Sequence, residues 1–374
     1  MKNETWDVVI VGAGPAGSAA AKRCAGHGLK TLLLEKRQPP RHKVCTGALM
    51  GATAQRLVDE VFGKLPPEVL TDPPYVEGFI VYSPGYEGRK SPHRMPLTWR
   101  QDLDYWMNGL AVKAGAELRV KARVNGVIEE ADGCRIILQG EEQPGEIKAK
   151  YVIGADGANS VIRRAIFPDF RPRFLQAFQE VYKTRLNLDP NYIHWYVLFP
   201  ERNIFEVHQK TWQGTPVTVL DANGRPGQVA KREEVVPRAL QVMAQECGFD
   251  PASPHLWTDG CRDAMWLREL FTGVFAPVKG RVLLCGDAGG VRLPVTAEGI
   301  GTGIQTGLLA ADAVRRAVSG EGSAEGAYRA AVQGLLAELR KLMPPSGYLA
   351  QQGDRGVEYL LDAYRQIYDI ALKY

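Results

Sequence analysis

The spacing of apolar and polar residues changes along the chain, and each spacing predicts a kind of secondary-structure element. Residues 6–11 form a short apolar run rich in β-branched side chains, which is typical of a strand buried on both faces of a parallel sheet. Small residues at 18–25 then predict a helix, and residues 30–34 predict a second strand. Strand, helix and strand in this order indicate a βαβ unit.

The middle of the chain alternates with the two-residue period of a half-buried strand. Residues 125–148 predict three short strands, with turns at 131–133 and 139–145, and residues 231–246 predict a helix. Aromatic and β-branched residues take alternate positions in four other segments, which together predict an antiparallel sheet that faces a ligand: 75–82, 174–182, 192–199 and 217–220.

The C-terminal part of the chain, residues 327–374, has a helical pattern that is interrupted at Pro344 and Pro345. Residues 357–370 are amphipathic, with apolar positions at helical spacing. We expect this helix to pack on its own chain. Contact with a membrane surface or a partner protein is the alternative.

A glycine cluster at the end of the first strand carries the first candidate chemistry. Gly12, Gly14 and Gly17 follow residues 6–11 directly, and Pro15 and Ala16 lie between them at the helix start. In a dinucleotide-binding βαβ unit, such glycines allow the tight turn, the approach of backbone to a pyrophosphate, and close helix–strand packing. The helix N-terminus attracts the phosphates.

An acidic residue ends the second strand of this unit. Glu35 has the spacing expected for a hydrogen bond to a ribose hydroxyl, and Lys36 follows it as a further candidate contact. The pattern therefore predicts a dinucleotide site, without distinguishing FAD from NAD.

Two later segments resemble motifs of one class of flavoprotein. Residues 150–164, with Asp156-Gly157, and residues 281–300, with Gly286-Asp287, resemble the "DG" and "GD" motifs of the glutathione-reductase-type FAD family in its hydroxylase-like branch. The resemblance implies that Asp287 binds the ribityl chain of FAD and that Asp156 is structural and near the cofactor. It also places Arg100 near FAD.

The same resemblance implies that a helix from Glu298 to about Val318 points its N-terminus, with Gly299 and Ile300, at the flavin pyrimidine. The expected fold class is α/β. A Rossmann-like FAD-binding domain is expected from residues 1–72, 97–170 and 264–325, a mostly antiparallel β substrate domain from 73–96 and 171–263, and a C-terminal helical segment from 326–374.

Three further segments resemble the geranylgeranyl reductase family within this class. Residues 294–300, Pro-Val-Thr-Ala-Glu-Gly-Ile, are similar to that family's Pro-Leu-Thr-Gly-Glu-Gly-Ile. Residues 43–47 are similar to its Lys-x-Cys-x-Gly loop, and residues 192–200 to its Tyr/Trp…Phe-Pro substrate motif. The chain departs from the family pattern at Arg292, at Ala297 and after Pro200, where the glycine-rich continuation is missing.

This family resemblance implies reduction of carbon–carbon double bonds of an isoprenoid or similar apolar substrate, by hydride transfer from reduced flavin. An alkene requires an apolar site, and the candidate substrate residues are Tyr192, Trp195, Phe199 and Pro294. Cys45 is a candidate proton donor or flavin contact, with a small buried residue as the alternative. Thr46 is a further candidate cofactor contact, and His42 and His194 are weaker candidate acids.

Two other functions remain open. One is an FAD-dependent monooxygenase or halogenase-like enzyme, although hydroxylases of this fold usually carry Gly-Asp-Ala-Ala-His and this chain has no histidine after Ala288. The other is a non-enzymatic flavoprotein that senses redox state or carries a lipid. Because the chain has one GxGxxG and no second nucleotide fingerprint, we expect a transient NAD(P)H or ferredoxin-like electron donor.

Charge and composition narrow the remaining possibilities. The net charge of +4 over 374 residues suits a phosphorylated cofactor or an acidic donor, and no dense basic cluster with interleaved aromatics predicts nucleic-acid binding. No apolar run reaches the roughly 18–20 residues of a membrane span, so we expect a cytoplasmic protein, with peripheral membrane contact left open. Six scattered cysteines without CxxC spacing favour neither a metal site nor a disulfide framework.

Overall fold

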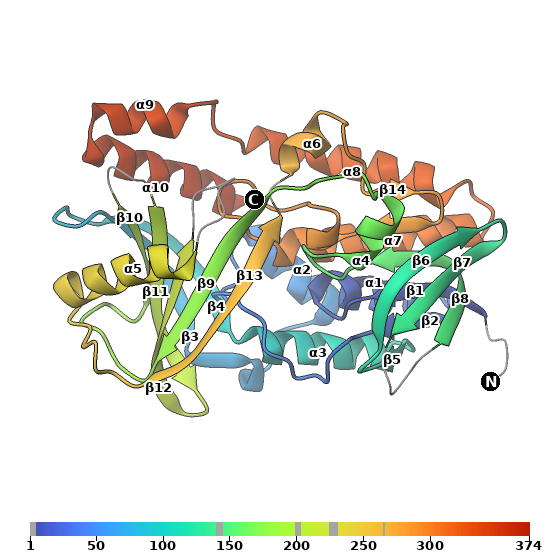
Figure 1. Ribbon diagram of the computed structural model, residues 1–374, viewed down its shortest axis with the longest axis horizontal. Coiled ribbons are helices and arrows are strands. Elements are labelled where there is room, and N and C mark those ends of the chain that lie inside the picture. Colours follow the sequence, from blue (N-terminus) through green and yellow to red (C-terminus); the bar gives the residue numbers. More distant parts are fainter. Residues whose placement is uncertain (1–4, 140–144, 199–202, 224–230, 265) are drawn as a thin grey trace.

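The computed structural model describes residues 5–139, 145–198, 203–223, 231–264 and 266–374. Two β-sheets lie at opposite ends of the long axis, and the C-terminal helices run along one side of both (Figure 1). The predicted α/β class, with a Rossmann-like part, an antiparallel part and helices at the C-terminus, is confirmed.

The first sheet has eight strands in the described residues, in the order β14-β15-β8-β1-β2-β5, with β7 paired to β8 and β6 paired to β7. Parallel pairing joins β15, β8, β1, β2 and β5. The predicted strands at 6–11 and 30–34 are confirmed as β1 and β2. The strands are β1 (Thr5–Val11), β2 (Thr31–Leu34), β5 (Glu117–Arg119), β6 (Arg123–Glu130), β7 (Gly133–Gln139), β8 (Gly145–Gly154), β14 (Val278–Lys279) and β15 (Val282–Leu284).

One expectation about this sheet is wrong. The third short strand, predicted to end at residue 148, continues without a break to residue 154 in the next segment, as the single strand β8. Ala149 pairs with Cys134 of β7 on one side and with Trp6 of β1 on the other. The two hydrogen-bonded ladders therefore overlap, and no break can form between them.

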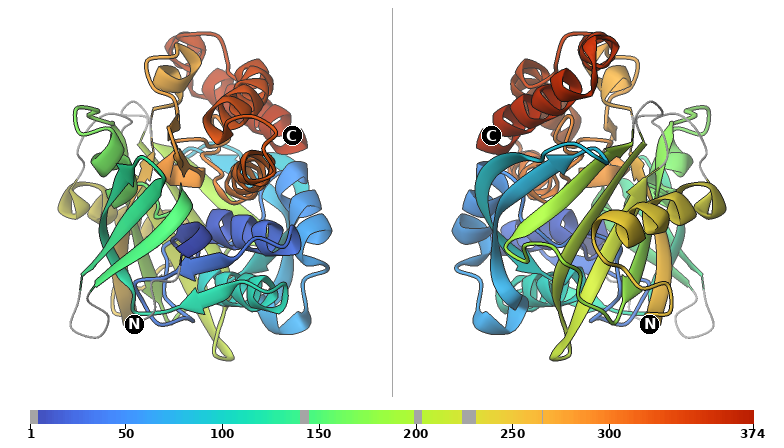
Figure 2. Two further views of the ribbon diagram at one scale, coloured as in Figure 1. Left: turned by 90° about the vertical axis from the view of Figure 1, so that its right-hand side faces the viewer. Right: turned by 90° about the vertical axis from the view of Figure 1, so that its left-hand side faces the viewer.

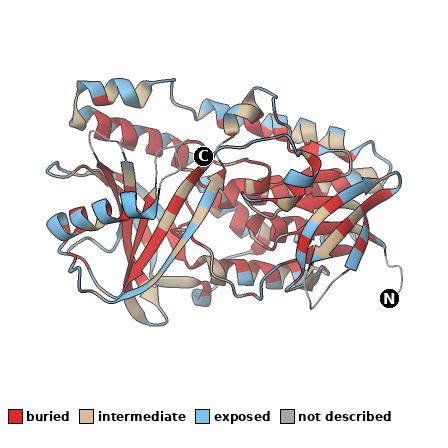
Figure 3. Cartoon of the chain, viewed as in Figure 1, coloured by how far each residue is buried: buried red, intermediate tan, exposed pale blue. Residues whose placement is uncertain are grey.

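Helices cover this sheet and supply most of its core. Gly17 in α1 and Gly307 in α7 have no side chains, and the backbones of α1, α7 and the turn after β1 approach one another closely there. The burial colouring shows an almost continuous buried interior at this end (Figure 3). The helices of this part are α1 (Pro15–Gly26), α2 (Ala52–Phe62), α3 (Arg100–Lys113), α4 (Val161–Ile166), α6 (Leu267–Phe271), α7 (Ile300–Val318) and α8 (Ala324–Lys341), with a 3-10 turn η2 (Gly286–Ala288) before α7.

The second sheet has seven strands in the described residues, in the order β13-β9-β12-β11-β10-β3-β4. Its pairs are antiparallel except β10 with β3. The side views show α5 (Arg232–Glu246) on the outer face of this sheet (Figure 2). The strands are β3 (Leu70–Tyr82), β4 (Arg89–Thr98), β9 (Phe174–Tyr182), β10 (Tyr192–Leu198), β11 (Asn203–Trp212), β12 (Thr215–Asn223) and β13 (His255–Ala264), and a 3-10 turn η1 (Pro67–Val69) precedes β3.

The C-terminal helices are shared between the two sheets. The tail breaks after α8, as the two prolines predict, and continues as α9 (Tyr348–Arg355) and α10 (Val357–Lys373). Tyr328 of α8 is buried in the core of the first sheet, whereas Leu361 and Tyr368 of α10 are buried against β3, β4 and β10. The apolar face of the amphipathic helix thus packs on its own chain.

The domain boundaries given above remain predictions, although β3 and β4 do join the second sheet within a few residues of the expected limits. In the described ranges, no helix combines the length and apolarity needed to cross a bilayer.

A candidate cofactor and substrate site

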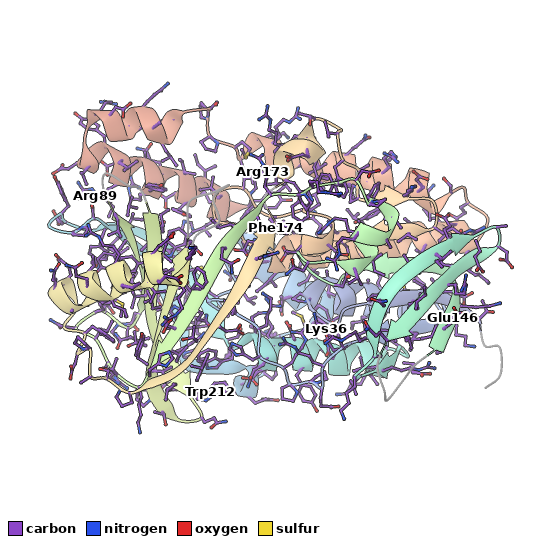
Figure 4. The ribbon with its side chains drawn as sticks, viewed as in Figure 1. Lys36, Arg89, Glu146, Arg173, Phe174 and Trp212 are labelled. Carbon is purple, nitrogen blue, oxygen red and sulfur yellow. The ribbon has the colours of Figure 1, made fainter. Side chains whose placement is uncertain are left out.

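A cavity of about 860 Å³ lies between the two sheets and is lined by residues from both. Lys36 and Arg173, both in its lining, lie near the middle of the long axis (Figure 4). Most predicted cofactor residues line it: Gly12, Gly14, Pro15, Ala16, Glu35, Lys36, Cys45, Thr46, Arg100, Asp156, Gly286, Asp287, Gly299 and Ile300. Of the predicted substrate residues, Trp195 and Pro294 line it too.

The three fingerprint glycines occupy different environments. Gly12 has φ +103°, and a Cβ there would lie 2.4 Å from the Ala155 carbonyl oxygen. A Cβ on Gly17 would lie 1.8 Å from the Gly12 carbonyl oxygen, so Gly17 allows α1 to pack on the turn and does not line the cavity. A Cβ on Gly14 would meet nothing closer than 3.8 Å, so its surface is open for a ligand to approach.

Glu35 at the end of β2 is buried, and its carboxylate holds the glycine turn in place. It accepts a hydrogen bond from the Ala13 N–H at 3.2 Å and another from Arg41 Nε at 3.0 Å. Arg41 also lies 3.3 Å from Asp104, which binds Arg100 through two hydrogen bonds of 2.9 and 3.1 Å. Arg41 and Arg100 therefore present positive charge to the cavity while paired with carboxylates. Arg41 is not part of any of the sequence motifs that predicted cofactor residues.

Asp156 has a local structural task. Its Oδ2 accepts hydrogen bonds from the Val161 N–H at 2.7 Å and the Ile162 N–H at 3.3 Å, at the start of α4. Burial raises the pKa of this carboxyl. The other oxygen, Oδ1, meets no hydrogen-bond partner among the described residues, and the residue lines the cavity.

Asp287 lies in η2 between the end of β15 and the start of α7. Its Oδ1 lies 3.5 Å from Arg292 Nε, beyond a good hydrogen bond, and has no other partner in the described chain. Arg292 also lies 3.1 Å from Asp263 of β13. The departure from the family pattern at Arg292 thus places a buried cation between two carboxylates at the cavity wall.

The loop before α7 shows why glycine is common at the second departure, Ala297. Ala297 has φ +53°, a left-handed conformation that glycine adopts more readily and that the family fills with glycine. Glu298 then accepts hydrogen bonds from the N–H groups of Ile300 and Gly301, the latter at 2.8 Å. Burial raises the pKa of Glu298 to about 7. The helix begins at Ile300, not at Glu298 as predicted, because Glu298 caps it.

The loop that carries Cys45 and Thr46 is attached to the second sheet. Gln179 of β9 donates to the Cys45 carbonyl at 3.2 Å, and Lys210 of β11 donates to the Thr46 carbonyl at 2.7 Å. The Thr46 hydroxyl donates to Glu206 of β11. Cys45 and Thr46 therefore lie where the two sheets meet the cavity.

A polar cluster behind this loop was missed by the sequence analysis. Glu206, His208 and Lys210 take alternate positions on β11, and Asp221 pairs with Glu206 on β12. All four are buried, and Glu206 and Asp221 line the cavity. Polar residues at every second position of a strand share one face of the sheet, and this pattern is visible in the sequence. The sequence does not show whether that face is buried or exposed to solvent, so the pattern alone did not predict a buried polar cluster.

The remaining candidates are placed as follows. Tyr192 does not line the cavity; its ring lies under Lys90, 4.8 Å from the amino group. Phe199 lies outside the described residues. His194 is buried, bonds the Asp189 carbonyl and also lies off the cavity. His42 lines the cavity and lies 3.3 Å from Asp259, and burial lowers the pKa of its ring.

The lining residues fit FAD. The α1 N-terminus and open Gly14 suit the pyrophosphate, Glu35 ends the strand beside them, and Asp287 Oδ1 accepts no hydrogen bond from the described residues and can take one from a hydroxyl. Phosphate, ribose and ribityl positions thus lie in one cavity, whose volume lies within the range of cofactor sites.

Comparison with known proteins also supports an FAD-binding protein. A family model described as an FAD binding domain matches residues 5–330. The digeranylgeranylglycerophospholipid reductase of Methanosarcina acetivorans is 29% identical over 344 residues, which cover 84% of this chain and 76% of that protein.

Solved structures share the fold at lower identity. A geranylgeranyl bacteriochlorophyll reductase-like protein from Thermoplasma acidophilum superposes with a TM-score of 0.70 and 22% identity, over 99% of this chain and 90% of that one. The flavin-dependent brominase Bmp2 gives a TM-score of 0.68 and 18% identity, over 99% and 95%.

Fold and site together define an enzyme, an oxidoreductase that uses FAD. The chain belongs to the FAD binding domain family. The resemblance to geranylgeranyl reductases predicted from the sequence is confirmed by the relatives.

Proposed function

We propose that this protein reduces carbon–carbon double bonds of an isoprenoid or a similar apolar molecule. The observation that carries the proposal is an apolar wall beside the cofactor residues, in the same cavity. Trp195 of β10 and Tyr368 of α10 meet edge to face, with ring centroids 4.4 Å apart. An alkene offers no hydrogen bonds, so a wall of aromatic and aliphatic side chains is the surface that would hold it. Met50, Ile204, Tyr364 and Val295 extend this wall.

When bound and reduced, FAD supplies the hydride for such a reaction. The chain's own residues bind the cofactor, orient the alkene and exclude water. Gly12, Gly14, Glu35 and Asp287 would hold the cofactor, while Trp195 and Pro294 would hold the substrate. Because α10 packs over β3, β4 and β10, it closes the apolar side of the cavity against solvent.

A proton must reach the second alkene carbon. Cys45 lies in the cavity lining, where it is a candidate proton donor or a contact of the flavin. Replacement of Cys45 by alanine tests the first assignment, because a proton donor would be needed for product formation but not for cofactor binding.

Anaerobic reduction of the purified protein, followed by mass spectrometry of products from geranylgeranyl substrates, tests the proposed activity. A gain of two hydrogens per double bond supports the reductase. A gain of one oxygen atom in air would instead identify an oxygenase, and a bound lipid that stays unchanged would identify a carrier.

We also propose that the electrons come from a transient donor, NAD(P)H or a ferredoxin-like protein. The absence of a second nucleotide fingerprint in the sequence supports this proposal. Bleaching of the flavin absorbance by one donor and not the other would identify it. Sedimentation with lipid vesicles would test peripheral membrane contact in the same preparation.

A further inference from the structure

Two buried carboxyl groups face the cavity side by side on neighbouring strands. Glu206 of β11 and Asp221 of β12 are directly opposed in the antiparallel register, on the cavity-facing side of the second sheet. They are 7% and 8% exposed. The Thr46 hydroxyl donates to Glu206, which also lies 4.0 Å from His208 Nδ1, and Gln179 donates to Asp221 at 2.9 Å. These contacts leave acceptor capacity on both groups, and Asp221 Oδ2 has no partner in the described chain.

Among Glu206, His208, Lys210 and Asp221, the charges balance when the two carboxyl groups share one proton. Lys210 is buried at 2% exposure, and burial lowers the pKa of its ammonium to about 8, so it stays largely charged at neutral pH. His208 is fully buried, and burial lowers the pKa of its ring, so it is neutral. One cation against two carboxylates would leave a net negative charge in the interior, which is costly. A single shared proton removes it.

Burial acts in the same direction on each carboxyl group. It raises the pKa of Asp221 to about 6, and burial together with the neighbouring Asp221 carboxylate raises the pKa of Glu206 well above its usual range. Two adjacent buried carboxyl groups that both favour their neutral form can hold one proton between them. The charged and titratable groups around the pair are Lys210 and His208 on β11, Tyr368 on α10, and Cys261 and Asp263 on β13, with Cys45 in the loop and Asp102 on α3 next to Lys210.

The pair is also well placed relative to the proposed substrate. Trp195 of the apolar wall is the cross-strand neighbour of Glu206 on its other side. Trp195, Glu206 and Asp221 therefore lie next to one another in a single row across three neighbouring strands, β10, β11 and β12. The Cys45–Thr46 loop is hydrogen-bonded to the same groups and fixes this row relative to the cofactor residues.

We infer that the Glu206–Asp221 pair is the acid of the reaction. In this step the Glu206 O–H bond breaks and its proton forms the new C–H bond at the second alkene carbon. The first carbon takes the hydride of the reduced flavin, so the double bond is consumed and the flavin is left oxidised. The Glu206 carboxylate then regains a proton from solvent through Asp221. This inference rests on the proposed function, and it assigns the proton donor that Cys45 would otherwise supply.

A divalent cation is the competing occupant of the cluster. Donor atoms of Glu206, His208 and Asp221 lie within 4.8 Å of one another, and neither ring nitrogen of His208 has a hydrogen-bond partner among the described residues. Lys210 argues against the cation, because it already supplies positive charge next to the carboxyl groups. Metal analysis of the purified protein therefore belongs to the test.

The test compares FAD-loaded wild type with Glu206→Gln, Asp221→Asn and Cys45→Ala. The matched control is Glu246→Gln, an exposed carboxyl on α5 at the outer face of the sheet. Infrared spectroscopy at neutral pH reads the carbonyl stretch of a protonated carboxylic acid independently of turnover. Glu298, with a pKa raised to about 7, contributes to the same band. We therefore expect an equal band in wild type, Cys45→Ala and Glu246→Gln, and a smaller band in Glu206→Gln.

Single-turnover reduction of a geranylgeranyl substrate gives the second readout. We expect Glu206→Gln to be slower by about 100-fold or more, which is typical of losing a general acid. Flavin content and the rate of flavin reduction by dithionite should be unchanged, and Asp221→Asn should shift the pH dependence of the substrate step.

Three outcomes would overturn the inference. Glu206→Gln reacting as fast as wild type would remove the pair from the reaction while leaving the proposed function intact. Wild type that reduces no alkene would refute the proposed function and with it the proton delivery. One equivalent of zinc or manganese in wild type, lost in His208→Ala, would show that a cation and not a proton occupies the cluster.

Discussion

Gly17→Ala should be the most damaging single-methyl change in the nucleotide-binding turn. The new Cβ would lie 1.8 Å from the Gly12 carbonyl oxygen and 3.3 Å from the Ala155 Cβ. An unstrained carbon–oxygen contact is about 3.3 Å, so α1 and the turn must separate by roughly 1.5 Å. The first obstacle is backbone directly after β1 and the second is a Cβ directly after β8, and neither is the end of a flexible side chain that could move away.

Overpacking of a buried site costs about 1–3 kcal/mol, and we expect this change to reach the upper end, about 3 kcal/mol in the free energy of unfolding. Because the displaced helix N-terminus is the proposed phosphate site, FAD should also be lost. Urea denaturation of the apoprotein measures the first effect, and flavin absorbance after gel filtration measures the second.

Two glycines of the same helix region are matched controls. Gly26→Ala meets nothing within 4 Å and should stabilise the protein by up to about 1 kcal/mol through helix propensity. Gly14→Ala meets only Arg41 at 3.8 Å, so the apoprotein should keep its stability while FAD binding weakens. The reasoning is refuted if Gly17→Ala retains both wild-type stability and FAD, or if Gly14→Ala unfolds the protein as strongly as Gly17→Ala does.

Three further changes have definite expected results. Tyr328→Phe removes the 2.7 Å hydrogen bond to the Leu284 carbonyl in the fully buried α8–β15 contact. Urea denaturation should show a free energy of unfolding lower by about 1–2 kcal/mol. An unchanged free energy of unfolding would show that the carbonyl finds another donor. Burial raises the pKa of Glu298 to about 7. Protonated Glu298 therefore stabilises the folded protein fully below about pH 4, and this contribution to the free energy of unfolding is lost as the pH rises through about 7. Thermal melts of the wild-type apoprotein should show the free energy of unfolding falling by up to about 3 kcal/mol between about pH 5 and about pH 8. Glu298→Gln should abolish this fall, and an unchanged pH dependence in the variant would contradict the reasoning. Trp195→Ala should lower stability by about 3 kcal/mol and raise KM for an apolar substrate while leaving the flavin bound, whereas an unchanged KM would remove Trp195 from the substrate wall.

Local patterns in the sequence determined the elements that form by themselves. Apolar runs and small residues were sufficient for β1, α1 and β2, and Gly12, Gly14 and Glu35 were recognisable because their spacing along the chain equals their spacing in a βαβ unit. The two prolines placed the break after α8 correctly. These features depend on interactions within about 30 residues, so the order of residues contains them.

Tertiary structure alone decided which distant segments meet. Glu206 and Asp221 became neighbours through the register of β11 and β12, and Arg41 met Asp104 only when α3 packed beside the glycine turn. The continuity of β8 and the burial of α10 on the second sheet likewise depend on partner strands far away in the chain. A pattern of polar and apolar residues indicates which side of a helix or strand is buried, but it does not indicate which other elements that side packs against. A buried polar side chain takes its chemistry from those partners, because they decide whether its charge is neutralised by a proton, an ion pair or a ligand.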